Sequence, residues 1–259
     1  MAWTKVHFFT FIPCFVIYIL FSIWLGLKLQ NQSDSIKLIP IHIISCILII
    51  LEIIKQIKAI QSGYTLNMLP LYFCSLFLFL FPLASLCKNK LKNTIRKLLL
   101  LSGAMVTGVM LIAPNIIYSS GALLDMFEDF TCFHTVVYHN LVVLGTCLML
   151  TLNLVNFDKP QYKLIFIFYF TGCFITAFFA TILNENYNNF VTSGIPFVET
   201  ARQWLVSSIG FAGQIIYISF IITMTISFGY IMYHVIRRLD KVWQKYLQKR
   251  DNKLESITT

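Results

Sequence analysis

The sequence predicts an all-α polytopic membrane protein, a bundle of about seven transmembrane helices, and three observations support that prediction. Of its 259 residues, 58% are hydrophobic and only 12% charged, whereas a soluble domain is about half apolar and a quarter charged. The mean hydropathy is +0.75. The apolar residues also gather in runs of about 20, the length that crosses the hydrocarbon core as a helix. Helices are expected because lipid cannot satisfy the open edges of strands.

Seven runs reach or approach that length, so we expect one continuous bundle rather than several domains. The runs are 8–29, 38–57, 69–87, 98–117, 133–155, 162–183 and 206–236. We expect no removable signal peptide, because the first apolar run is longer than a signal h-region and lacks a clear cleavage site. The transmembrane domain is therefore expected over residues 1–236, followed by a basic amphipathic tail over 237–259.

The loop charges predict the orientation of the bundle. The loops after the first, third and fifth runs, together with the C-terminal tail, carry 16 Lys and Arg residues, and the opposite side carries 4. The positive-inside rule then places the N-terminus outside and the C-terminus in the cytoplasm. The same topology explains the net charge of +9, so nucleic-acid binding is not expected.

In the tail, the apolar side chains of Ile236, Leu239, Trp243, Tyr246 and Leu247 share one helical face. Two interpretations stay open: an amphipathic helix lying on anionic lipid, and a plain juxtamembrane stop signal.

The seven cysteines do not predict a disulfide framework or a metal site. Their number is odd, and no CxxC or Cys/His spacing typical of a metal site occurs. Cofactors and metals are therefore not expected. In apolar runs, cysteine commonly behaves as a small hydrophobic residue.

Polar residues collect near the predicted outer ends of several runs. Cys74 lies about five residues into the third run and His139 about six into the fifth, which puts both roughly 7–9 Å below the outer surface. Glu52 and Asn115 lie near the outer ends of the second and fourth runs, and residues 184–187 end the sixth. Because ionisable groups within a membrane usually face a cavity or a partner, these residues predict a site open to the outer leaflet.

Each residue also has a structural interpretation. Cys74 is either a packed small residue or a nucleophile, and Glu52 either belongs to the site or only pairs with Lys55 at i+3. His134 lies nearer the interface than His139. The two histidines are five residues apart and do not share a helical face, so they make a poor metal pair.

Four segments resemble one known family. The run 69–75, with Leu-Pro-Leu-Tyr-Phe-Cys-Ser, resembles the Leu-Pro-Leu-His-x-Cys signature of the YwaF family of integral membrane proteins. Residues 52–55 look like the preceding helix end in that family. The run 134–139 looks like its His-rich fifth span, and 184–187 resembles its Asn-Tyr segment. The YwaF family is itself similar to the transmembrane protein 164 acyltransferases.

The resemblance implies a multi-pass protein of a cell membrane, here the bacterial plasma membrane, that transfers acyl chains between phospholipids. The essential cysteine of the family falls on Cys74, and its histidine on His139, with His134 as the alternative. Tyr72 stands where relatives often have histidine, so a role for that histidine does not carry over.

Two functions are therefore open. In the first, an acyltransferase or acyl hydrolase uses Cys74 as nucleophile and His139 as base, with Asn186 or Asn115 stabilising the oxyanion. Tyr187 supports the same polar cluster. The helix N-terminus is expected to add little, because Cys74 would lie just past the first turn. In the second, a transporter or lipid-binding receptor uses the pocket without chemistry. Membrane lipids are the expected partners of both.

Overall fold

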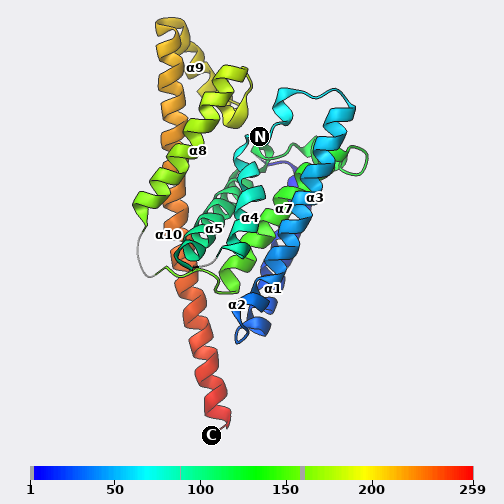
Figure 1. Cartoon of the computed structure of the whole chain (residues 1–259), viewed down its shortest axis with the longest axis vertical. Helices are drawn as coiled ribbons and strands as arrows, with labels where there is room; N and C mark the ends of the chain where they lie inside the picture. The colour runs from blue at the N-terminus through cyan, green and yellow to red at the C-terminus, as the bar shows by residue number, and fades with distance from the viewer. Residues whose placement is uncertain (1–2, 88, 158–160, 259) are drawn as a thin grey trace.

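The protein is described here by a computed structural model covering residues 3–87, 89–157 and 161–258, and the described residues form an all-helical bundle (Figure 1). Six of the described helices are long and apolar enough to cross a membrane. They include α1 (Lys5–Leu29), α3 (Ile39–Gln61), α5 (Asn89–Ile112), α7 (Phe130–Thr151), α8 (Tyr162–Leu183) and α10 (Phe211–Thr258). Short helices α2 (Asp34–Lys37) and α6 (Ser120–Leu124) lie in loops. The predicted fold class is confirmed.

The expected third span, 69–87, is only partly helical. A 3-10 turn, Phe73–Leu76, leads directly into α4 (Phe77–Leu86), and together they rise roughly 20 Å, less than the hydrocarbon thickness of about 30 Å. Leu69 is extended (ψ 139°), as is usual before a proline such as Pro70. The chain still passes from one end of the bundle to the other here, but its upper part does so as irregular backbone (Figure 1).

The seventh span is predicted over 206–236, and the predicted start at residue 206 is wrong. Residues up to Ile209 belong to a separate helix, α9 (Pro196–Ile209), which folds back against α10 (Figure 1). Gly210 makes the reversal with φ 61° and ψ −135°, a conformation open to glycine alone. Hydropathy does not detect this break, because apolar residues continue on both sides of the glycine.

Two groups of helices pack separately and meet near residue 73. Helices α1, α3, α4, α5 and α7 share the larger apolar core, whereas α8 and α10 pack with part of α5 around a second one. The ring of Phe73 joins the two, because it packs at the edge of both cores and stacks on buried Tyr169 at 6.0 Å between centroids. The 69–76 segment therefore lies where the two groups meet.

Bonds at the two ends of the bundle agree with the predicted pairing of the loops. At one end, the buried His7 ring bonds through Nε2 to the Tyr118 carbonyl at 3.0 Å. At the other, Gln30 donates to Asp251 at 2.9 Å, which brings the loop after α1 to the C-terminal tail. Which end faces the cytoplasm stays a prediction. Lys88 and Lys159, which contribute to the charge count, lie outside the described residues.

The tail continues the membrane helix. Helix α10 passes residue 236 without a break and keeps its direction (Figure 1). Trp243 Nε1 donates to the Thr151 carbonyl at 3.0 Å, and Gln244 donates to Asn153 at 2.7 Å, so the tail packs on the end of α7. The division at 236/237 stays a prediction, and residues 1, 2 and 259 of those two ranges lie outside the described part of the chain.

Candidate functional site

The turn that holds Cys74 is fixed by a neighbouring loop. The backbone N–H of Phe73, which opens the helical stretch, donates to Asn188 Oδ1 at 2.8 Å. Asn188 has φ 52°, a left-handed conformation that asparagine tolerates better than most residues. Sequence reasoning chose its neighbours Asn186 and Tyr187 and missed Asn188. The run of asparagines at 184–189 was the available signal, because asparagine is favoured in loops that need positive φ.

Cys74 lies in the first turn of this helical stretch, not past it. The expectation of a start near Leu69 was wrong, because the backbone before Phe73 is extended. The thiol therefore lies within the range where the positive end of the helix dipole acts. The Cys74 carbonyl also accepts a hydrogen bond from the Tyr138 hydroxyl at 3.0 Å. That bond holds the cysteine turn directly against α7.

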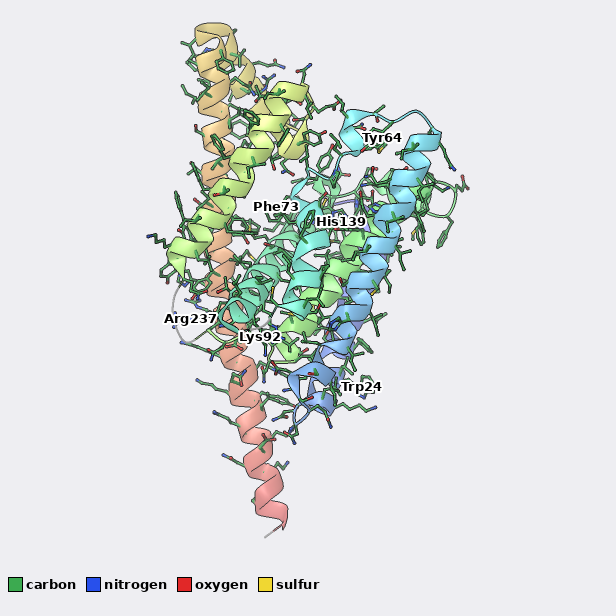
Figure 2. All side chains as sticks on the ribbon, viewed as in Figure 1. Trp24, Tyr64, Phe73, Lys92, His139 and Arg237 are labelled. Carbon is green, nitrogen blue, oxygen red and sulfur yellow. The ribbon has the colours of Figure 1, made fainter. Side chains whose placement is uncertain are left out.

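Helix α7 carries both histidines close to Tyr138. His139 is the next residue, and His134 lies one helical turn earlier. The His134 and Tyr138 rings stack, with centroids 5.3 Å apart. His139 is buried, and its Nδ1 lies 2.7 Å from the Thr135 carbonyl. Because a carbonyl only accepts, Nδ1 carries the proton and Nε2 keeps its lone pair. His139 thus has the tautomer that a base acting through Nε2 needs. Phe73 and His139 lie at the same level of the bundle, well away from Lys92 and Trp24 (Figure 2).

Glu52 does more than pair with its helical neighbour. Its Oε1 lies 2.7 Å from Lys55 Nζ and also accepts from the Gln56 amide at 2.7 Å. Its Oε2 lies 3.2 Å from His134 Nε2, across the interface between α3 and α7. Both Glu52 and His134 are buried. Pairing with Lys55 alone is therefore an incomplete description, because Glu52 also lies close to His134, although His134 Nε2 makes no hydrogen bond within the described residues.

Three predicted site residues remain. Tyr187 is buried, whereas Asn186 and Asn115 are exposed. Tyr187 is fully buried, donates its hydroxyl to the Leu66 carbonyl and packs edge-on against Tyr72. Asn186 accepts from the backbone N–H groups of residues 191 and 192 through Oδ1, which leaves its amide nitrogen available. Asn115 is exposed in the 3-10 turn after α5 and takes no part in the bonds described above.

A small pocket adjoins the cysteine turn. It has a volume of about 180 Å³ and lies between residues 70–79 and residues 168–176 of α8, with Asn188 at its edge. Phe73 and Ser75, the neighbours of Cys74, both line it, but Cys74 and His139 do not. Gly172 forms part of the far wall, where no other group comes within 4 Å of its missing side chain. Sequence reasoning did not identify the α8 wall, because its residues are ordinary apolar ones.

A bundle of apolar helices with a buried Glu52–His134 pair and a cysteine turn bonded to a histidine helix defines a polytopic membrane protein with a polar site inside one end. Within the described residues, no group of three His, Cys, Asp or Glu side chains is arranged to hold a metal ion.

Residues 2–233 match the model of the TMEM164 family, nearly the whole chain, and the protein belongs to that family. The match supports the resemblance to transmembrane protein 164, while the narrower YwaF assignment stays a prediction. No curated protein and no solved structure matches the chain.

Proposed function

We propose that this protein is a phospholipid acyltransferase or acyl hydrolase in which Cys74 is the nucleophile and His139 the base. The observation that carries the proposal is the Tyr138–Cys74 hydrogen bond. It places the helix that presents His139 beside the turn that presents Cys74, in a chain of the TMEM164 family. His134 is less suited to the same role, because its Nε2 faces Glu52.

The reaction proceeds in two balanced steps. In the first, His139 Nε2 takes the thiol proton while the Cys74 sulfur attacks an acyl ester carbonyl. The acyl–oxygen bond breaks, the lysolipid alkoxide takes the proton back from His139, and a thioester remains. In the second, the hydroxyl of another lysolipid, or water, gives its proton to His139 and attacks the thioester, and the sulfur recovers a proton from the imidazolium. A lysolipid acceptor gives transfer, and water gives hydrolysis.

The surroundings of Cys74 support this chemistry. Its place in the first helical turn puts it near the positive end of the helix dipole. The amide nitrogen of Asn186, which makes no hydrogen bond among the described residues, is a candidate donor to an oxyanion. The 180 Å³ pocket beside Phe73 and Ser75 is suited to the part of an acyl chain nearest the ester.

Cys74→Ala tests the proposal. The full-length protein is reconstituted in phosphatidylethanolamine vesicles with isotope-labelled lysophospholipid, and labelled diacyl product is measured. We expect Cys74→Ala to reduce product to background, while Cys87→Ala, at the other end of the same helix, keeps wild-type activity. Alanine at 74 should cost on the order of 1 kcal/mol of stability, because it removes a single sulfur.

Lipid profiles of cells with and without the gene, and of cells carrying Cys74→Ala, give the physiological counterpart. A non-enzymatic transporter or receptor would show the same lipid profile in Cys74→Ala cells as in wild-type cells, and would form no product in vesicles.

A further inference from the structure

A large apolar cavity lies between four helices, and the cysteine turn is not among its walls. Its volume is about 650 Å³, and its walls come from α1, α5, α7 and α10. Phe15, Ile19, Leu111, Leu150 and Leu239 are representative of the lining. The volume falls within the range of small-molecule sites, roughly 300–1,000 Å³. Neither Cys74 nor His139 lines this cavity, so it is separate from the site proposed above.

The wall formed by α10 has a directional pattern. Its lining residues recur at helical spacing from Met232 through Leu239 and Trp243 to Tyr246. The same face continues one and two turns further to Arg250 and Lys253, because positions i+4 and i+7 share a helical face. An apolar wall followed by two cations matches a phospholipid, in which an apolar acyl chain is followed by an ester and then a phosphate.

The cationic end of the cavity is held in place by α1. Arg250 bonds to the Gln30 side-chain oxygen and lies 2.9 Å from Asp251, while Gln30 donates to Asp251 at 2.9 Å. Lys253 is exposed beside this cluster. The cations are therefore positioned at the end of the cavity rather than along it.

A buried hydroxyl inside the cavity lacks an acceptor. Ser22 of α1 is fully buried and lines the cavity, and its Oγ has no hydrogen-bond partner among the described residues. Serine within a helix usually bonds back to the carbonyl four residues earlier, and the threonines on these walls do so. An unpaired buried hydroxyl costs free energy, but Ser22 is fully covered by neighbouring atoms, so its hydroxyl does not itself reach a ligand in the cavity.

The dimensions fit one acyl chain. From Met232 to Tyr246 the α10 wall rises roughly 21 Å, more than the roughly 15 Å of hydrocarbon in one leaflet. An engineered cavity of about 150 Å³ holds one benzene, so 650 Å³ has room for roughly two dozen carbon atoms. That is enough for one full-length chain and too little for two.

We propose that this cavity binds one acyl chain of a phospholipid from the tail-side leaflet, with the lipid phosphate at Arg250 and Lys253. The ligand is a whole phospholipid whose second chain stays in the bilayer. The site does not depend on acyl transfer at Cys74.

Photocrosslinking tests the proposal in the full-length protein. The protein is reconstituted in phosphatidylcholine vesicles with a small fraction of phosphatidylcholine that carries a diazirine in one acyl chain, and labelled peptides are mapped by mass spectrometry. We expect labelling of the cavity-lining segments of α1, α7 and α10. Leu239→Trp, which places an indole in the cavity, should reduce that labelling about tenfold. Ile167→Trp, on an exposed apolar position of α8, should leave it unchanged.

A second arm tests the phosphate. A diazirine diacylglycerol and a diazirine fatty acid with the same chain should label the cavity less than the phospholipid does. Arg250→Gln combined with Lys253→Gln, both on the tail, should remove that preference without altering the membrane-spanning core. Equal labelling in Leu239→Trp and Ile167→Trp would overturn the proposal by showing only surrounding bilayer lipid. Equal labelling by all three probes in the wild type would overturn the phosphate assignment.

Discussion

The two ends of the helical bundle both bury charged side chains, but they satisfy them with different partners. At the cysteine end, Glu52 is surrounded by the side chains of Lys55, Gln56 and His134. Every one of these partners is a polar side chain. A network built from side chains can change its protonation and rearrange, which suits a site that handles protons and charged intermediates.

At the tail-side end, a buried arginine bonds largely to the backbone. Arg96 donates to the carbonyls of Ala84 at 3.1 Å and Leu154 at 3.3 Å, and its guanidinium also lies 3.1 Å from Asp34. These bonds join the end of α4, the segment after α7 and helix α2. Backbone carbonyls do not titrate, so this arrangement fixes the loops in place. The comparison indicates that chemistry belongs to the cysteine end, and that the tail-side bonds hold the loops in place.

The largest expected effect is on catalysis at the cysteine end. His139→Ala should reduce acyl transfer in vesicles to background, because the Cys74 thiol then has no base to take its proton. The double variant with Cys74→Ala should be no less active than either single variant, because the two residues act as one unit. His42→Ala, a histidine on α3 that bonds to its own helix through the Leu38 carbonyl, is the control and should stay active. If the double variant were much less active than either single variant, Cys74 and His139 would contribute independently to the reaction.

The next largest effect is on stability at the tail-side end. Arg96→Met should lower the free energy of unfolding by about 3–5 kcal/mol, because it leaves two buried carbonyls without this donor and removes one of the two cations that contact Asp34. Lys92→Met removes the more exposed ion pair with Asp34 and should cost about 1 kcal/mol or less. Thermal unfolding of both variants in detergent measures the difference. Similar losses for the two variants would show that Arg96 does not fix the loops.

The fold class and most of the helices were predictable from apolar runs, because lipid imposes the same length on every crossing helix. Two boundaries were not. The break at Gly210 lies inside the predicted run 206–236. The extended backbone before Phe73 is joined to Asn188 by a contact over more than a hundred residues. Such boundaries are decided by tertiary contacts, which a hydropathy pattern does not contain.

The candidate site was predictable in its residue types but not in its connections. Depth along the helices predicted Cys74 and His139 at one level, but the count for Cys74 assumed a helix from Leu69, where the backbone is extended. The bond from Tyr138 to Cys74 and the contact between Glu52 and His134 depend on which helices are neighbours and how each is rotated. The α8 wall of the small pocket and the role of Asn188 required the structure for the same reason.

A smaller effect tests whether the Glu52 network is one unit. Glu52→Gln should lower the free energy of unfolding by about 1.5–3 kcal/mol, because Lys55 and His134 lose their shared carboxylate while the amide keeps some hydrogen bonds. Lys55→Met in the Glu52→Gln background should then cost less than it does in the wild type. Additive losses in this double-mutant cycle, measured by thermal unfolding, would show that the groups are independent.

The smallest expected effect is a pH dependence in the α9–α10 hairpin, which belongs to neither end network. Arg202, bonded to Glu199 at 2.6 and 2.9 Å, lowers the pKa of that carboxyl from 4.5 to about 2. Helix α9 is not among the six helices able to span a membrane. Because the folded pKa is below the unfolded one, the carboxylate contributes stability that is complete above about pH 4.5 and is lost as the pH falls towards 2. The melting temperature should therefore fall less between pH 6 and pH 3 in Glu199→Gln than in the wild type, by an amount fitting a partly exposed pair. Glu185→Gln, in the loop before α9, controls for the loss of one carboxylate and should keep the wild-type dependence. An identical fall in all three proteins would show that the pair contributes nothing to the acid sensitivity of the fold.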